Sequence, residues 1–177
     1  SAIIGFSLLF MGLGFLKDSV PELGPDSALV QFFVEYKDIP VLSTLLFVLL
    51  GTLVTVIVQS SSAAMALTMT LVAGGIVPFE VASAMILGEN IGTTITAEIA
   101  STIGNVHAKR SARIHSMFNI IGVTWAVLLF PFILDGIEAF MLATGGGSPF
   151  DNPAEHANTG LAIFHTTFNL LNVLILI

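Results

Sequence analysis

Cysteine is absent from the 177 residues, which excludes disulfides, cysteine-ligated zinc and thiol catalysis. Charge is scarce too, because charged residues make up 10% of the chain, whereas roughly a quarter is usual in a soluble domain. With only five Lys and Arg, the chain offers no basic surface of the kind that binds nucleic acid. The remainder is mostly hydrophobic, at 55% of residues and a mean hydropathy of +0.97. The composition therefore predicts an all-α integral membrane protein.

The acidic residues outnumber the basic ones and give a formal net charge of −7. Most of them lie in two stretches, residues 17–40 and 135–158, so this charge reflects connecting loops and not a particular partner. The chain starts at Ser1, and its opening lacks the basic region and small-residue cleavage site of a signal peptide. We expect one membrane domain, residues 1–177, that is a segment of a longer polypeptide.

Apolar runs divide the chain into candidate membrane segments, since about 20 helical residues cross a bilayer. Residues 114–134 and 159–177 are predicted spans, and 2–16 would be a third if the helix continues upstream. Residues 17–40 are predicted to be an extramembrane connection with one short surface helix. Lys109, Arg110 and Arg113 lie in a stretch without acids, which the positive-inside rule places in the cytoplasm. Both acidic connections then lie outside, provided that residues 41–77 return to the side from which they start.

The sequence Gln59-Ser60-Ser61-Ser62 interrupts the long apolar stretch 41–77. Polar side chains at membrane depth are costly unless they face protein, water or a ligand. Consecutive hydroxyls also favour helix caps over helix interiors. We therefore predict a re-entrant helical hairpin in which one helix stops near Gln59 and another starts near Ser62. The free N–H groups at that start would attract an anion, although hydrogen bonds between helices are an alternative role for the tetrad.

A second interruption is predicted within residues 78–101, at Gly88-Glu89-Asn90-Ile91-Gly92-Thr93-Thr94. Two glycines and an asparagine permit a break, and Thr93 or Thr94 could cap the following half-helix. Asn90, Thr93 and Thr94 share a helical face, and their oxygens suit a small cation or an oxyanion; ordinary capping is the alternative.

Glu89 is predicted to lie near the bilayer midplane, where an ionised carboxylate is costly. It is either a cation or proton site, or a structural carboxylic acid that is neutral or paired with a backbone amide. Glu98 is expected to lie nearer the cytoplasmic end and to reach water.

A short motif occurs twice, as His115-Ser-Met-Phe-Asn119 and His165-Thr-Thr-Phe-Asn169. In each copy the His and the Asn are four residues apart and share a helical face. Metal binding is one interpretation, but we favour hydrogen bonds between helices. Trp125 is expected to serve packing.

The Gln-Ser-Ser-Ser tip, followed after about 25 residues by Gly-x-Asn-Ile-Gly-Thr-Thr, resembles the sodium-dependent phosphate cotransporter family, of the bacterial type II-like kind. The resemblance covers essentially the whole chain and is strongest over residues 51–122. It implies two inverted repeats, each with such a hairpin, around a shared site for sodium and inorganic phosphate. One tetrad is present, so the chain resembles one repeat, the second. Glu89 departs from the family pattern, which usually has a small residue there.

The resemblance implies seven substrate or ion ligands: Gln59, Ser60, Ser61, Ser62, Asn90, Thr93 and Thr94. The position of Glu89 makes it a further candidate. Gln59, Ser62, Asn90 and Thr93 are the candidate sodium ligands. The expected function is sodium-coupled phosphate transport in a bacterial inner membrane, without an enzymatic activity and without a cofactor other than the coupling ion. The expected partners are phosphate, sodium, the lipid bilayer and the other repeat.

Two other functions are weighed against transport. One is a non-transporting membrane subunit that senses phosphate or scaffolds a partner. The other is an intramembrane serine hydrolase that uses Ser60, Ser61 or Ser62 with His115 or His165. The Gly-x-Ser-x-Gly turn that usually carries such a nucleophile is absent.

Overall fold

Every regular element in the described part of the chain is a helix, as predicted. The computed structural model describes residues 2–19, 26–36 and 41–176. The elements are α1 (Ala2–Ser19), α2 (Ala28–Tyr36), α3 (Leu42–Val58), α4 (Ser61–Ala73), α5 (Phe79–Ser101), α6 (Val106–Leu128), α7 (Phe130–Ala143), the π-helix η1 (Pro153–Ala157) and α8 (Asn158–Leu176).

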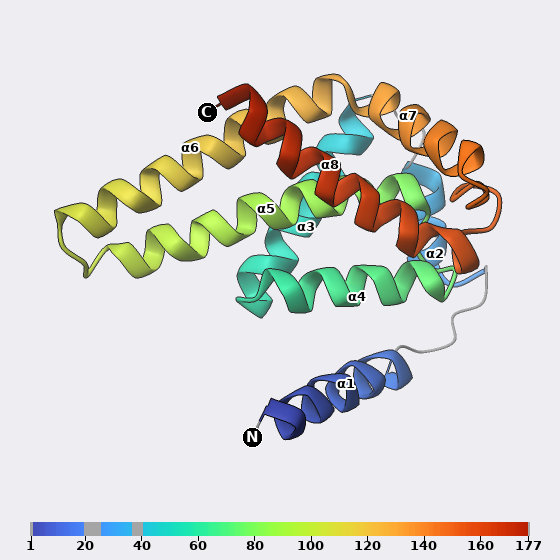
Figure 1. Ribbon diagram of the computed structural model, residues 1–177, viewed down its shortest axis with the longest axis horizontal. Coiled ribbons are helices and arrows are strands. Elements are labelled where there is room, and N and C mark those ends of the chain that lie inside the picture. Colours follow the sequence, from blue (N-terminus) through green and yellow to red (C-terminus); the bar gives the residue numbers. More distant parts are fainter. Residues whose placement is uncertain (1, 20–25, 37–40, 177) are drawn as a thin grey trace.

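Helix α5 is the central element, and α3, α4, α6 and α8 all pack against it (Figure 1). Residues 81–89 of α5 are buried without interruption. A helix that is covered on every side needs apolar or small residues all round, and Val81 to Leu87 supply them. Glu89 is the exception at the end of this buried stretch.

Helices α3 and α5 approach so closely that their backbones touch at glycines. A Cβ on Gly51 would overlap the backbone of Met85, and one on Gly88 would overlap the carbonyl of Val48. The Thr52 hydroxyl, in the same contact, donates to the carbonyl of Gly88 at 3.0 Å. Small residues that let helix backbones meet are typical of membrane helix pairs.

This packing corrects the prediction of a second break, because α5 runs without interruption from Phe79 to Ser101. Gly88 and Gly92 make room for α3 and do not open the helix. Thr93 donates to the carbonyl of Glu89 at 2.8 Å and Thr94 to that of Ile91 at 2.7 Å. Both hydroxyls thus bond back to their own helix and cap no half-helix.

The C-terminal half also differs from the prediction. Helix α6 starts at Val106, capped by the Asn105 side chain, which accepts from the N–H of Ala108 at 2.9 Å. The predicted span 114–134 is divided between α6 and α7, which meet at an angle of 78°. Pro131, in the first turn of α7, cannot continue α6 because it lacks an N–H and clashes with the preceding turn. Much of the predicted connection 135–158 is therefore helical.

The ends of the chain agree better with the predictions. Helix α8 begins one residue before the predicted span 159–177, of which residue 177 is not described. The expected short helix within 17–40 is α2, whose Val30 and Phe33 are buried against the body of the molecule. Helix α1 extends to Ser19, and the rest of that predicted connection, residues 20–25 and 37–40, lies outside the described residues.

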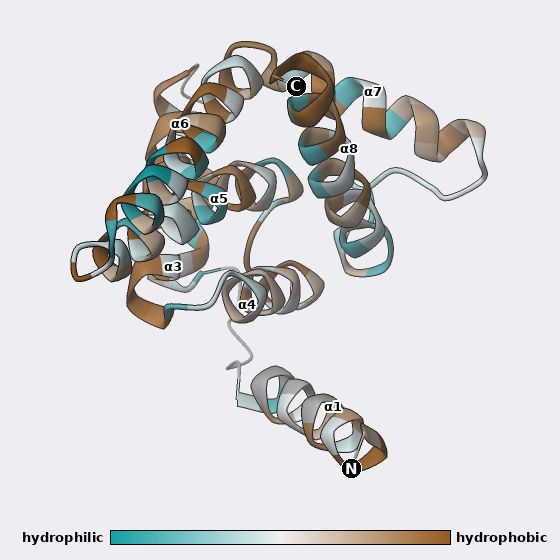
Figure 2. Cartoon of the chain, turned by 60° about the vertical axis from the view of Figure 1, so that its left-hand side comes forward, coloured by the Kyte–Doolittle hydropathy of each residue, from teal (hydrophilic) through white to brown (hydrophobic). Residues whose placement is uncertain are grey.

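One helix of the described ranges, Pro153–Leu176, is long and apolar enough to cross a membrane, and α6 with α7 would add a second if the bent pair forms one span. Helix α3 presents an apolar stripe at every fourth residue, with exposed fractions of 49% for Leu45, 55% for Leu49 and 78% for Ile57. Figure 2 shows hydrophobic residues along α3 and at the C-terminal end of α8. Outward-facing apolar side chains of this kind suit a lipid environment.

Candidate functional site

The predicted break at the polar tetrad is present. Helix α3 ends at Val58, and Gln59 takes the left-handed conformation with φ 58° and ψ 23°. Ser60 is extended and caps α4, its hydroxyl accepting from the N–H of Ala63 at 3.3 Å. The new helix begins at Ser61, one residue earlier than predicted.

The start of α4 leaves hydrogen-bond donors free. The N–H groups of Ser61 and Ser62 have no intrahelical acceptor, as in any first helical turn, and no other partner in the described residues. The helix dipole adds positive potential at the same end. This end of α4 is therefore suited to an anion.

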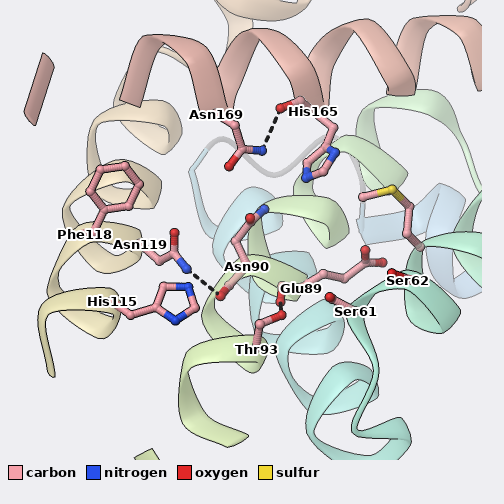
Figure 3. Close-up of a pocket in the computed structure, with 11 residues that line it drawn as sticks. Ser61, Ser62, Glu89, Asn90, Thr93, His115, Phe118, Asn119, His165 and Asn169 are labelled. Atoms are coloured by element: carbon pink, nitrogen blue, oxygen red, sulfur yellow. Dashed lines mark hydrogen bonds between the residues drawn. The ribbon is translucent and has the colours of Figure 1, made fainter. Parts of the chain in front are cut away.

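A cavity of about 280 Å³ opens beside the start of α4, between α4, α5, α6 and α8 (Figure 3). Its lining combines hydroxyls, amides, imidazoles and one carboxylate, and none of the lining residues is Lys or Arg. The lining residues are Ser61, Ser62, Met65, Glu89, Asn90, Thr93, His115, Phe118, Asn119, His165 and Asn169.

Glu89 is the carboxylic acid of this cavity and is only 1% exposed. One carboxylate oxygen accepts from the Thr68 hydroxyl at 2.7 Å. The other, Oε2, is buried and has no hydrogen-bond partner among the described residues. Figure 3 shows the carboxylate directed toward Ser61 and Ser62. A buried carboxylate with an unpaired oxygen needs a cation or a proton to offset its desolvation, so the cavity has a place for one.

The α5 wall of the cavity continues one helical turn beyond Glu89. The Asn90 amide N–H donates to the carbonyl of Ile86 at 2.9 Å, and the Thr93 hydroxyl donates to the carbonyl of Glu89. The side-chain oxygens of both residues remain free as acceptors, and such oxygens are hard ligands of the kind that small cations prefer.

Three other predicted ligands lie outside the lining. Thr94 is buried and bonded within α5, while Gln59 and Ser60 are exposed at the break. Gln59 supplies the turn and Ser60 the cap, so both shape the start of α4.

The repeated His and Asn motifs of α6 and α8 meet across the same cavity. Asn119 donates to the carbonyl of Asn90 at 3.1 Å, which is the predicted kind of bond between helices. Asn169 instead donates to the carbonyl of His165 within its own helix, at 2.8 Å. Neither imidazole has a hydrogen-bond partner in the described ranges, and no group of three metal-binding side chains occurs there.

Thr68 and Met65 are the site residues that the sequence interpretation missed. Met65 follows Ser61 by four residues and Thr68 by seven, on one face of α4, so the helical period offered a signal. Trp125 does more than pack, because its ring N–H donates to the side-chain oxygen of Asn172 at 3.2 Å and so links α6 to α8.

Comparison with known proteins gives a consistent result. The family model described as Na+/Pi-cotransporter matches residues 41–171. The chain is 27% identical over 174 residues to the "Putative inorganic phosphate export protein YjbB" of Escherichia coli (strain K12), a match that covers 98% of this chain and 29% of the relative. It is 39% identical over 85 residues to the uncharacterized protein YqeW of Bacillus subtilis (strain 168), covering 48% of this chain and 27% of the relative. The chain thus spans less than a third of the length of these curated relatives. No solved structure matches.

Proposed function

Because the chain belongs to the Na+/Pi-cotransporter family, we propose that it supplies part of a membrane site that transports inorganic phosphate together with sodium. The proposal places the chain in a cell membrane, as one of two inverted repeats, the second, of a longer protein. It assigns phosphate to the start of α4 and sodium to the neighbouring oxygens of α4 and α5. The single tetrad and the share of its relatives that the chain covers support a partial site.

One observation carries this proposal: Ser61 and Ser62, whose N–H groups are free at the start of α4, line the cavity that also contains the buried carboxylate of Glu89. An anion beside that carboxylate, when it is ionised, would be repelled unless a cation lies between them. Sodium bound by Glu89 with the oxygens of Ser62, Asn90 and Thr93 would remove the repulsion. Each ion would then improve the site for the other, which is the physical basis of coupled transport.

The functional test is phosphate flux in liposomes that contain the full-length protein. An imposed sodium gradient should drive labelled phosphate across the membrane, and an equal potassium gradient should not. The measurement should be made with both orientations of the gradient, since one relative is named for export. Flux that does not depend on sodium would contradict the coupling, and phosphate binding without flux would favour the sensing subunit.

A matched pair of variants links the flux to the site. Ser61→Ala removes a hydroxyl that lines the cavity, whereas Ser111→Ala removes an exposed hydroxyl of α6 that lies outside it. Flux should fall severalfold in the first variant and stay at the original rate in the second. Equal rates in both would contradict the proposed site.

A further inference from the structure

The two imidazoles of the cavity have no role in the site as described so far. His115 on α6 and His165 on α8 are 50 residues apart in the sequence, yet they line the cavity that also contains the start of α4. In Figure 3 both rings are directed into the space around Asn90 and Glu89. Side chains that approach one cavity from different helices are typical of a binding site.

A phosphate at the start of α4 needs more partners than that helix provides. A tetrahedral oxyanion has four oxygens, whereas α4 offers the N–H groups of Ser61 and Ser62 and their hydroxyls. The Asn90 and Asn119 amides each use one N–H in a bond to a backbone carbonyl, as Asn169 does. The lining contains no Lys or Arg. The two imidazoles make no hydrogen bond within the described residues, so their N–H groups are free for the oxygens that point away from α4.

Contacts between helices fix the backbone segments that carry both imidazoles. Asn119, one turn after His115 on α6, is bonded to the backbone of α5. Asn172 on α8 is fully buried, donates to the carbonyl of Phe118 on α6 at 3.2 Å and accepts from Trp125. A Cβ on Gly122 would overlap the Asn172 amide, so the glycine allows this contact. These bonds hold α6 and α8 at a set distance and reduce the entropy lost when a ligand binds.

We propose that His115 and His165 bind the oxygens of the transported oxyanion that point away from α4. This inference rests on the proposed function and adds the ligands on the opposite side of the site. The ligand class is a tetrahedral oxyanion, with phosphate as the substrate. Neutral imidazoles are sufficient, because each has one N–H to donate and one nitrogen that can accept from a phosphate hydroxyl.

The test is the phosphate dependence of flux in the full-length protein at saturating sodium, with the variants His115→Ala and His165→Ala. Each should raise the KM for phosphate about tenfold, as expected for the loss of one hydrogen bond to a charged group. The maximal rate and the half-saturating sodium concentration should change less than twofold. His115→Gln and His165→Gln, which retain an N–H donor, should recover part of the affinity.

His107→Ala is the matched control, since His107 is exposed in the first turn of the same helix as His115 and lies outside the cavity. An unchanged KM in the alanine variants, with normal flux in the original protein, would overturn the inference and leave the proposed function intact. A change in sodium dependence alone would also overturn it, by assigning the histidines to the cation. If the original protein neither binds nor carries phosphate, the proposed function itself fails.

Discussion

Glu89 places a buried carboxylate next to the helix end where we propose that an anion binds. Its carboxylate is almost inaccessible to water, it has one hydroxyl partner, and it lies beside a helix end that favours anions. Desolvation of such a group is offset only when a positive charge or a proton accompanies it. We therefore propose that this side chain links the cation to the substrate.

Glu89→Gln should weaken the sodium dependence of phosphate flux. The amide has nearly the same shape but no charge, so the half-saturating sodium concentration should rise at least tenfold in liposomes. Glu98→Gln is the matched control, because Glu98 lies on the same helix and accepts from Ser116 at 3.0 Å outside the cavity. An identical sodium dependence in the original protein and in Glu89→Gln would rule out the carboxylate as a cation ligand.

Ser60→Ala should weaken phosphate binding indirectly, because Ser60 lies outside the cavity lining. The hydroxyl of Ser60 caps α4, and loss of such a cap costs about 1 kcal/mol, so the N–H groups of the first turn should become less ordered. We expect about a fivefold loss of phosphate affinity by calorimetry, and Ser60→Asn, which restores a capping side chain, should recover most of it. An alanine variant with the original affinity would show that the cap does not organise the site.

At the scale of helices, the contact between α3 and α5 determines where the cavity lies. It sets Thr55, near the end of α3, against Gly92 of α5, and the chain then turns so that Ser61 and Ser62 line the cavity together with Glu89 and Asn90. The contact depends on three glycines, at 51, 88 and 92, each of which lies against backbone or side-chain atoms of the partner helix. A larger side chain at any of these three positions would push the two helices apart.

Gly88→Ala should destabilise the protein, because the added methyl group would overlap the backbone of Val48. We expect a loss of about 3 kcal/mol, at the upper end of the usual overpacking range, seen as a lower thermal midpoint in detergent. Gly136→Ala on α7 is the control, since its added Cβ meets no atom within 4 Å and alanine favours a helix. A midpoint equal to that of the control would contradict the close packing of α3 and α5.

The same contact explains which elements were predictable. The break at residues 59–62 follows from local chemistry, because a polar tetrad within an apolar run favours caps over helix interior. The break expected at Gly88 to Thr94 was wrong because glycine serves either a break or a close approach, and the neighbour that decides between them, α3, is remote in the sequence. The bend between α6 and α7 had a local signal in Pro131, but the continuous hydropathy of residues 114–134 favoured a single span.

At the scale of the whole molecule, the cavity depends on contacts that no local pattern specifies. The two His and Asn motifs were visible as a repeat, yet their shared position follows from α6 and α8 both packing on α5. The family and the all-helical architecture were predictable, because composition and two spaced motifs determine them. The sequence did not predict which of the candidate ligands line the cavity. Thr94, for example, is bonded within α5 and lies outside the lining.

The membrane orientation gives a prediction at this scale. The chain has no cysteine, so single cysteines can be placed in the full-length protein once any others are removed. A membrane-impermeant maleimide should label Ala154→Cys on intact cells, and Ser111→Cys, beside the basic stretch, only after permeabilisation. Labelling of both positions from the same side would contradict the predicted orientation.

The most direct measurement is the position of the bound anion. Crystals of the full-length protein grown with sodium and arsenate, a tetrahedral analogue of phosphate, would show the arsenic atom by anomalous scattering. We predict a peak in the cavity between the N–H groups of Ser61 and Ser62 and the imidazoles of His115 and His165. A peak elsewhere, or an empty cavity in crystals of a protein that transports arsenate, would contradict the proposed site.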